Sequence, residues 1–322
     1  MRLTGFLLGC VASLGIMAGA AAQTSYPERP IRLVVPFPPG GGTDTISRNV
    51  ADKLGRANGW VISIDNKPGA GGIVGLSDLA NAPADGYSIG MGQTSNLAIN
   101  PAAMPSIPFN AQTAFKPVAL VAEIPLVLVV RADSPIKTME DLVKLAKSSK
   151  EPIKQAVPGV GTMGHLAGEM LALRAGYPVL IVPYKGASPA ISDLLGGQTD
   201  FMLSTPQGAI GLVNSGKLRA IAVTSASRVP ALSQVPTVAE SGYPGFIAID
   251  WKGVVAPAGT PDAIVEKLNK AINEALKDKD LLEQLNREAS LPMGGSVAQA
   301  ATFIKKEQAD WAKVIKDINF KL

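Results

Sequence analysis

The sequence contains little of the chemistry on which metalloproteins and most enzymes depend. Among its 322 residues there is one cysteine, Cys10, and one histidine, His165. A single thiol excludes a disulfide framework, and so few thiol and imidazole ligands argue against a zinc or iron–sulfur site. Aromatic residues make up 5% of the chain, too few for the stacking platforms that bind nucleic acids. We therefore expect no metal, no cofactor and no nucleic-acid partner.

Recognisable catalytic motifs are missing as well. The chain has no GxSxG nucleophile elbow, and His165 has no evident partners for a catalytic triad. Asp44 is the one acid in the glycine-rich candidate loops, where its charge favours a helix N-terminus. The glycine, serine and threonine residues of these loops offer no general base. The sequence therefore predicts no catalytic residue and a protein that binds its ligand without transforming it.

The N-terminus carries the features of an export signal. Residues 1–22 begin with a positive charge, continue as an apolar stretch and end in three alanines. The alternative is a lipoprotein signal, because residues 7–10 resemble a lipoprotein cleavage box in which Cys10 would be lipidated. Removal of residues 1–22 leaves a chain without cysteine. Such a chain fits the bacterial periplasm.

The first strand ends in a loop that is rich in proline and glycine. Residues 31–36 are apolar, the loop follows, and a helix with a regular apolar face begins near Thr43. Glycines without Cβ atoms let the backbone approach a ligand closely. The amides of Gly41, Gly42 and Thr43 would point out of a helix N-terminus, which favours an anion. The alternative is a strand-to-helix turn that binds nothing.

The chain continues as α/β units that divide into two domains. Residues 27–100 repeat a strand–loop–helix pattern, which is typical of a parallel sheet covered by helices. A polar loop follows the strand at residues 87–91, and ligands of open α/β sheets bind beside such strand ends. The proline-rich residues 101–117 indicate a crossing to a second domain. We expect one lobe at residues 23–117 and 225–322, and the other at residues 118–224.

The second lobe contains another glycine-rich turn. Gly159, Gly161 and Gly164 form a GxGxxG pattern after a strand, but the acid expected near Tyr184 for a dinucleotide ribose is absent. A second helix N-terminus remains, whose amides and Thr162 hydroxyl suit an anion. His165 would lie in the first turn of this helix. It either packs and caps there or contacts the ligand.

A set of motifs follows the order found in one family of transport receptors. In sequence order they are YPxxPIRLVVPF at 26–37, PGG at 39–41 with Asp44, NKPGAGG at 66–72, DGY at 85–87, HLAGE at 165–169, VPYKG at 182–186, DLLGGQ at 193–198, GKLRA at 216–220, PTxAE at 236–240 and APAGTP at 256–261. With these motifs the chain resembles the Bug/TctC family, the extracytoplasmic solute receptors of tripartite tricarboxylate transporters. The resemblance covers essentially the whole mature chain.

The resemblance implies a fold and a site. The fold is the two-lobed α/β periplasmic-binding-protein (Venus flytrap) fold, with a mostly parallel sheet flanked by helices in each lobe. Backbone amides and hydroxyls of two loops would hold a carboxylate, and two further loops would contact the distal end of the solute. Ser204 stands where several members carry an acid, so we expect a solute without an ammonium group. The expected ligand-binding residues are Phe37, Gly41, Gly42, Thr43, Asp44, Gln93, Thr94, Ser95, Gly159, Gly161, Thr162, His165, Ser204 and Thr205.

The resemblance also implies a role. The expected protein is a monomeric periplasmic receptor that captures a small organic carboxylate in the interlobe cleft. It would deliver this ligand to the membrane permease subunits of a tripartite tricarboxylate transporter. One alternative is a receptor that feeds a sensor kinase in signalling. The other is an exported α/β hydrolase.

Overall fold

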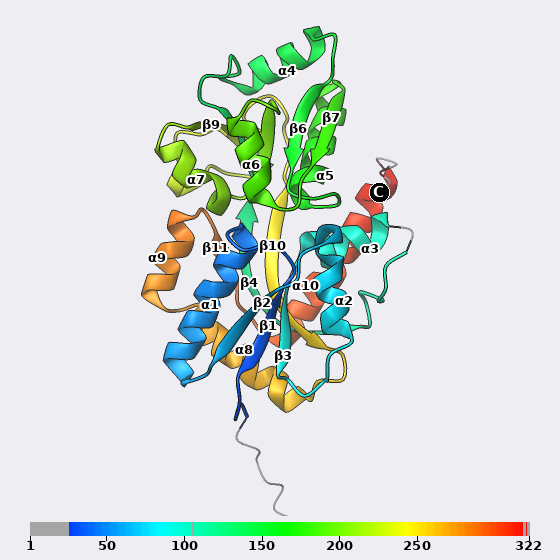
Figure 1. Ribbon diagram of the computed structural model, residues 1–322, viewed down its shortest axis with the longest axis vertical. Helices are drawn as coiled ribbons and strands as arrows, with labels where there is room; N and C mark the ends of the chain where they lie inside the picture. Colours follow the sequence, from blue (N-terminus) through cyan, green and yellow to red (C-terminus); the bar gives the residue numbers. More distant parts are fainter. Residues whose placement is uncertain (1–25, 105, 318–319, 321–322) are drawn as a thin grey trace, which may run out of the picture.

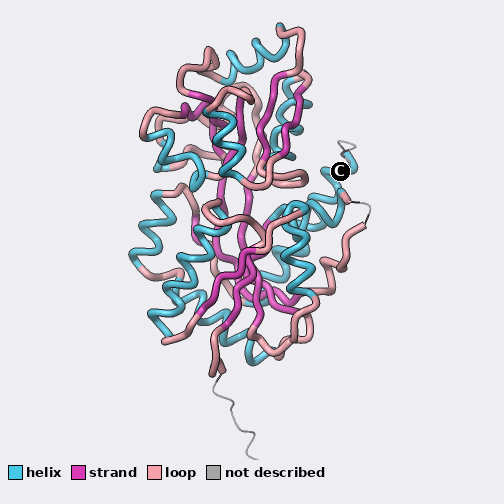
Figure 2. The backbone as a smooth tube through the Cα atoms, in the orientation of Figure 1, coloured by secondary structure: helices cyan, strands magenta, loops and turns pink. Residues whose placement is uncertain are grey.

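The chain folds into two α/β lobes that lie one above the other along the long axis (Figures 1 and 2). The structure, a computed structural model, describes residues 26–104, 106–317 and 320. The expected export signal at residues 1–22, with its alternative lipid site Cys10, lies outside these residues. Within the described part of the chain, no helix has both the length and the apolar character needed to cross a membrane.

Each lobe is built on one sheet with a parallel centre. In lobe 1, β1 pairs in parallel with β2 and β3, whereas β10, β4 and β11 are added in antiparallel fashion. In lobe 2, β6 pairs in parallel with β7 and β8, whereas β5 is antiparallel to β8 and β9. The strand order in lobe 1 is β11 (Leu291–Pro292), β4 (Phe115–Pro125), β10 (Ile249–Pro257), β3 (Ser88–Gln93), β1 (Ile31–Val35) and β2 (Ile62–Asn66). The order in lobe 2 is β7 (Val179–Pro183), β6 (Ile153–Val157), β8 (Phe201–Ser204), β5 (Val127–Arg131) and β9 (Leu218–Val223).

Helices flank both sheets, as Figure 1 shows. The sequence pattern accounts for them locally: Ile46, Val50 and Leu54 bury one face of the first helix, and the Thr138 side chain caps the fourth. Lobe 1 contains α1 (Gly42–Asn58), α2 (Ile73–Ala80), α3 (Asn100–Ala103), α8 (Asp262–Ala275), α9 (Lys279–Arg287) and α10 (Val297–Asp317). Lobe 2 contains α4 (Met139–Ser148), α5 (Met163–Ala175), α6 (Ala187–Leu195) and α7 (Pro206–Asn214). Short turns occur at η1 (Ala70–Gly72), η2 (Ser95–Ile99) and η3 (Pro230–Leu232).

The two-lobed α/β fold expected from the sequence is confirmed, and the sheets are mixed rather than mostly parallel. Apart from the short β11, the antiparallel strands are those next to the crossings between the lobes. The chain passes from β4 of lobe 1 directly into β5 of lobe 2, and returns from β9 to β10. Because two passages connect the lobes in opposite directions, the strands that feed them run antiparallel to their neighbours.

The first crossing lies later in the chain than the sequence suggested. Residue 117, the expected boundary, falls inside β4, which pairs with β10 as far as Pro125. Leu126 therefore begins the passage into lobe 2. Pro117 does not end the strand because the pairing shifts register opposite it, between Val254 and Val255 of β10. Such an irregularity accommodates the missing N–H of a proline.

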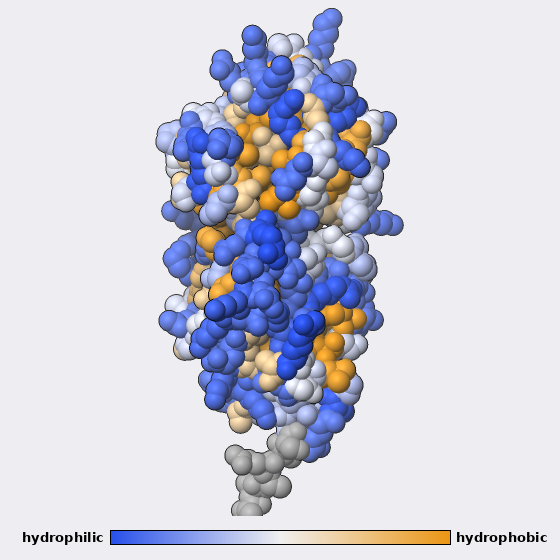
Figure 3. Space-filling view, turned by 90° about the vertical axis from the view of Figure 1, so that its left-hand side faces the viewer, coloured by the Kyte–Doolittle hydropathy of each residue, from blue (hydrophilic) through white to orange (hydrophobic). Residues whose placement is uncertain are grey.

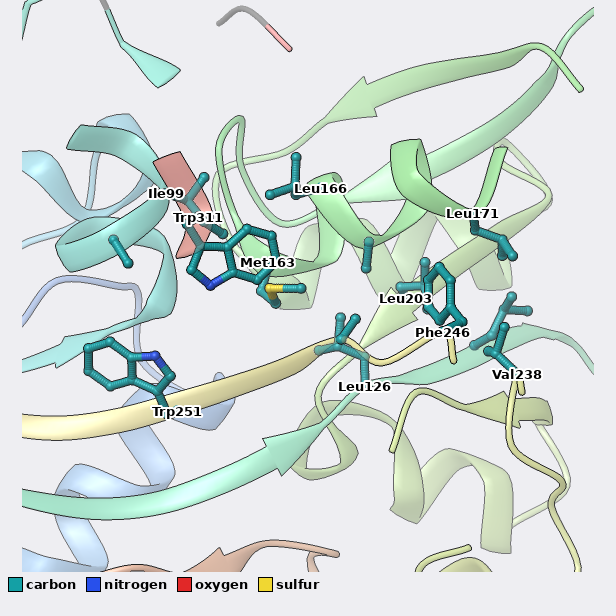
Figure 4. Packing of buried hydrophobic residues seen from close by; sticks show 14 of the residues in the cluster. Ile99, Leu126, Met163, Leu166, Leu171, Leu203, Val238, Phe246, Trp251 and Trp311 are labelled. Atoms are coloured by element: carbon teal, nitrogen blue, oxygen red, sulfur yellow. The ribbon is translucent and has the colours of Figure 1, made fainter. Parts of the chain in front are cut away.

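One apolar core runs from lobe 1 into lobe 2 along the side of α10. Figure 4 shows Trp251 of β10 and Trp311 of α10 close to Met163 of α5, and all three belong to one buried cluster. The Nε1–H groups of both tryptophans donate to Glu307 of α10, at 2.8 and 3.2 Å. The two lobes thus share packing on one side of the hinge strands.

On the face shown in Figure 3, the surface over lobe 1 is largely hydrophilic, and apolar side chains gather over lobe 2.

Packing of α5 against β8 predicts opposite effects of the same substitution at two helical glycines. A Cβ atom on Gly164 would lie 2.5 Å from the Leu203 carbonyl oxygen, whereas one on Gly211 would meet nothing within 4 Å. We expect Gly164→Ala to lower the free energy of unfolding by about 1–3 kcal/mol, because the backbone must shift. Gly211→Ala, the matched control, should raise it by about 0.5–1 kcal/mol. Urea unfolding midpoints measure both, and a Gly164→Ala midpoint at or above that of the wild type would contradict this packing.

Candidate ligand-binding cleft

A cavity of about 120 Å³ lies between the two lobes. It is smaller than the cavities of about 300–1,000 Å³ that hold drug-sized ligands, so its size suits a small molecule. The loops that follow β1, β6, β7 and β8 form its walls, together with the end of β3 and part of β10. The lining residues are Phe37, Pro38, Pro39, Gly41, Gly42, Thr43, Gln93, Leu126, Pro158, Thr162, Met163, Gly164, Gly186, Ala187, Ser188, Pro189, Met202, Leu203, Ser204, Thr205, Asp250 and Lys252.

Four helix N-termini meet at this cavity. The first residues or caps of α1, α5, α6 and α7 all belong to its lining. The N-terminus of a helix carries about half a positive elementary charge, because its first N–H groups have no partner within the helix. One helix comes from lobe 1 and three come from lobe 2. An anion in the cavity would therefore be stabilised by partial positive charges from both lobes.

The start of α1 shows how these amides are left free for a ligand. Its N-cap, Gly41, has no side chain to cap the helix, and the first helical hydrogen bond is donated by Thr45 to the Gly41 carbonyl. The amides of residues 42–44 precede that bond. Gly41, Gly42 and Thr43 lie in the lining, and the anion contact expected of their amides stays a prediction.

Asp44 secures the first loop from behind and lies outside the cavity lining. Its carboxylate accepts hydrogen bonds from the Gly40 amide, Arg48 and Asn66, each at 2.9 Å. Burial alone would raise the pKa of Asp44, but the hydrogen bonds from Arg48, Gly40 and Asn66 outweigh it and hold the pKa below its ordinary value. An ionised Asp44 thereby fixes the shape of the loop.

The lobes touch across the cleft at glycines. A Cβ atom on Gly42 would lie 2.6 Å from the Thr205 hydroxyl of lobe 2, and one on Gly186 would lie 2.9 Å from Pro38 of lobe 1. The structure therefore has the lobes closed on each other. Gly42 is required for this approach of the two lobes, in addition to the approach of a ligand that the sequence suggested.

The second glycine-rich turn is partly occupied by its own hydrogen bonds. The Gly161 amide donates to His165 Nδ1 at 3.1 Å, and the Thr162 hydroxyl donates to the Gly159 carbonyl at 2.8 Å. The His165 amide in turn donates to Thr162 Oγ1, and the ring packs against Phe320 with centroids 5.2 Å apart. His165 is therefore engaged within the protein. Thr162 caps α5 and also lines the cavity.

The expected binding residues divide into two groups. Those that line the cavity are Phe37, Gly41, Gly42, Thr43, Gln93, Thr162, Ser204 and Thr205. Those outside its lining are Asp44, Thr94, Ser95, Gly159, Gly161 and His165. Thr94 accepts the Trp251 amide, and Ser95 accepts from the Gln93 side chain, so both hold the scaffold behind the cavity. Gly159 instead lines a larger groove of about 510 Å³, which shares Phe37, Pro38, Pro158 and Gly186 with the cavity lining.

Two functional candidates escaped the sequence analysis, Asp250 and Lys252 of β10. They are the charged residues in the cavity lining, and they are 3% and 1% exposed. Lys252 Nζ donates to Asp250 Oδ2 at 2.5 Å and to Gln93 Oε1 at 2.8 Å. The Thr43 hydroxyl donates to the same Gln93 oxygen at 2.5 Å. This chain of contacts joins β10, β3 and the first turn of α1.

A signal for this pair was present in the sequence. Residues two apart on a strand face the same side, so Asp250 and Lys252 share one face of β10. The rest of that strand is buried and apolar toward its C-terminal end. Two opposite charges in a buried strand indicate an ion pair, because an isolated buried charge is costly. What the sequence did not give was the contact of that face with Gln93.

Burial and the ion pair shift the pKa of Lys252 in opposite directions. Burial lowers the pKa of Lys252, and the neighbouring Asp250 carboxylate works against this decrease. Together the two residues add no net charge to the cavity wall. In the described part of the chain, no group of three or more His, Cys, Asp or Glu residues is arranged to hold a metal ion.

The chain is similar to known proteins over nearly all of its length. Residues 46–320 match the model of the TctC family, described as tripartite tricarboxylate transporter family receptors. The protein BugT of Bordetella pertussis is 37% identical, over 97% of this chain and 96% of its own. The structure of the periplasmic binding protein BugD superimposes with a TM-score of 0.88 at 35% identity, covering 92% of this chain and 99% of BugD. An R. palustris protein solved with adipate gives a TM-score of 0.89 at 33% identity, with coverage of 92% and 99%.

The glycine contact across the cleft predicts that a larger side chain holds the lobes apart. In Gly42→Val the new side chain would occupy the space of Thr205 and Gln207, whose nearest atoms would lie 2.6 and 3.0 Å from the Cβ. Small-angle X-ray scattering should give a larger radius of gyration for this variant than for the wild type. Gly211→Val, where a Cβ has open space, is the matched control and should keep the wild-type radius. Equal radii for all three proteins would show that this contact does not limit closure.

The buried ion pair predicts a large loss of stability when its cation is removed. In Lys252→Met the Asp250 carboxylate is left buried without its partner, which costs about 3–5 kcal/mol in the free energy of unfolding. The control is Lys306→Met, because Lys306 and Asp310 form an exposed pair on α10 that contributes little. Chemical denaturation measures both variants. A Lys252→Met midpoint equal to that of Lys306→Met would mean that Asp250 does not depend on the lysine.

Proposed function

This chain belongs to the tripartite tricarboxylate transporter receptor family, and on that premise we propose that it is a periplasmic receptor for a small organic carboxylate. It binds this solute between its lobes and delivers it to the membrane permease subunits of such a transporter. The family is one of solute-binding receptors and not of enzymes. Residues 1–22 would direct the chain to the periplasm, and the monomer would be the working unit.

The observation that carries the proposal is the meeting of four helix N-termini at one small cavity. The lining charges, Asp250 and Lys252, neutralise each other. The partial positive charges of the helices therefore have no negative partner in the cavity wall, and a carboxylate supplies one. A carboxylate has about four lone-pair positions, so it can accept from amides of both lobes at once.

The residues that would contact the solute follow from the lining. The amides of Gly42 and Thr43 in lobe 1, and those at the start of α5 in lobe 2, would hold the carboxylate. The hydroxyls of Ser204 and Thr205 would bind the distal part of the solute. The R. palustris relative solved with adipate supports a carboxylate as the ligand class, since it aligns over 99% of its own length.

Closure of the lobes connects binding to transport. The contacts between Gly42 and Thr205, and between Pro38 and Gly186, form when the lobes meet. A bound anion that both lobes hold favours this closed state over an open one. Closure also changes the relative position of the outer surfaces of the two lobes, and a permease can distinguish the loaded receptor by that difference. The two passages of the chain between the lobes, β4 to β5 and β9 to β10, suit such a hinge.

The proposal predicts that the protein binds small carboxylates with a measurable gain in stability. Native mass spectrometry of protein purified without unfolding should show a co-purified small acid. A thermal-shift panel of aliphatic and aromatic carboxylates should then raise the melting temperature for a subset. A ligand at 100 times its Kd stabilises the folded state by about 2.7 kcal/mol. Amines and uncharged sugars of similar size serve as controls and should give no shift.

Uptake measurements in the source cells separate transport from the other roles. Deletion of the gene should abolish uptake of the carboxylate that binds, and restoring it should rescue uptake. A deletion that leaves uptake intact but removes a transcriptional response to the solute would favour the signalling role. Release of a chemically changed product by the purified protein would contradict the proposal and favour the exported hydrolase.

A further inference from the structure

We infer that Asp250 and Lys252 form a hydroxyl-recognition site in the cavity wall, and that the solute is a carboxylate bearing a hydroxyl group. This inference rests on the proposed function, because it adds a second contact to the carboxylate held at the helix N-termini. The pair lies on β10, the strand by which the chain returns to lobe 1.

The first observation is an unpaired acceptor. Asp250 is 3% exposed and lines the cavity, and its Oδ2 atom accepts from Lys252. Its other oxygen, Oδ1, is buried and has no hydrogen-bond partner among the described residues. Buried carboxylate oxygens are nearly always hydrogen-bonded, because leaving one without a donor costs its lost hydration. A donor from outside the protein, either a group of the solute or a bound water, would satisfy this oxygen.

The second observation is an unused donor beside it. The ammonium group of Lys252 has three protons, and within the described residues it donates to Asp250 and Gln93 only. The hydrogen bonds fix the orientation of the Gln93 side-chain amide, so its oxygen and not its nitrogen faces Lys252. It accepts from Thr43 as well as from Lys252, while its Nε2 atom donates to Ser95 at 2.9 Å. Because both side chains belong to the cavity lining, the pair can offer one acceptor and one donor to a bound solute.

A hydroxyl group matches this combination. It donates one hydrogen bond and accepts others, so it can satisfy Asp250 Oδ1 and the third proton of Lys252 together. An ammonium group has donors only and would face the Lys252 ammonium. A carboxylate has acceptors only and would face the free Asp250 oxygen. A methylene group would leave both unsatisfied.

The electrostatics agree with a neutral group at this position. Asp250 and Lys252 already neutralise each other, so the site gains nothing from a second charge in the solute. The carboxylate of the solute has its own place at the start of α1 and α5. The structure brings an acid, Asp250, into the cavity, so the absence of an acid at Ser204 no longer supports a solute without an ammonium group. The neutrality of the ion pair supports it instead, and it stays a prediction.

The test compares acids that share a carbon skeleton and differ in one group. Three sets serve: succinate, malate and aspartate; glutarate, 2-hydroxyglutarate and glutamate; and 3-phenylpropanoate, 3-phenyllactate and phenylalanine. Each set carries hydrogen, hydroxyl or ammonium next to a carboxylate. Isothermal titration calorimetry with the wild-type protein should show that, in the set that binds, the hydroxy acid has a Kd at least tenfold lower than both counterparts.

A variant locates the preference. In Asp250→Asn the amide oxygen stays on the Lys252 ammonium, because that hydrogen bond is charge-assisted. The amide nitrogen then faces the cavity, so the acceptor becomes a donor. The preference for the hydroxy acid over its unsubstituted counterpart should fall to less than threefold. The matched control is Asp262→Asn, because Asp262 is an exposed acid of α8 paired with Lys116, and it should keep the full preference.

The outcomes separate this inference from the proposed function. If no carboxylate binds, the proposed function fails and this inference fails with it. If carboxylates bind but hydroxy acids have no advantage, or if the amino acids bind most tightly, the hydroxyl site alone is wrong. An Asp250→Asn protein that keeps the tenfold preference would also exclude this site. If that variant does not fold, the wild-type comparison still decides the question.

Discussion

The organisation of this protein depends on helix N-termini that face one another across a cleft. A helix start leaves amides without partners, and such groups are costly to bury unless something accepts their hydrogen bonds. Here α1 of one lobe and α5, α6 and α7 of the other all begin at the same cavity. A guest with negative charge satisfies these amides better than water can once the lobes exclude solvent. The fold therefore leaves helix N-terminal amides without acceptors at the cavity, and a bound anion would supply those acceptors.

The glycines and the buried ion pair fix the positions of these helix N-termini around the cavity. Gly42 and Gly186 let the lobes approach until backbone and side chains of opposite lobes touch. Lys252 donates to both Asp250 and Gln93, and the Gln93 oxygen also accepts from Thr43 at the start of α1. The position of the first helix thus depends on a strand from a distant part of the chain. Because the ion pair is neutral, it shapes the cavity without competing with the helices for the anion.

The hinge side of the molecule has the opposite character. There the lobes share an apolar core, in which Trp251 and Trp311 pack together near Met163 and both donate to Glu307. Burial raises the pKa of Glu307, although the hydrogen bonds from the two indoles oppose that rise. A continuous core on one side and a polar cavity between the lobes on the other let the lobes move without separating. The strands that connect them, β4 to β5 and β9 to β10, are the natural place for that motion.

Local features were readable from the sequence because they depend on neighbours in the chain. The glycine-rich turn before α1, the Thr138 cap of α4 and the strand at Ile153–Val157 follow from residue type and spacing. Even Pro117 was a reasonable stop signal, and only the register shift opposite it in β10 let the strand continue. Contacts between Lys252 and Gln93, or between Gly42 and Thr205, join residues that lie far apart in sequence. The tertiary structure decided these, because the pairing of distant strands and the closure of two lobes set them, and no local pattern records either.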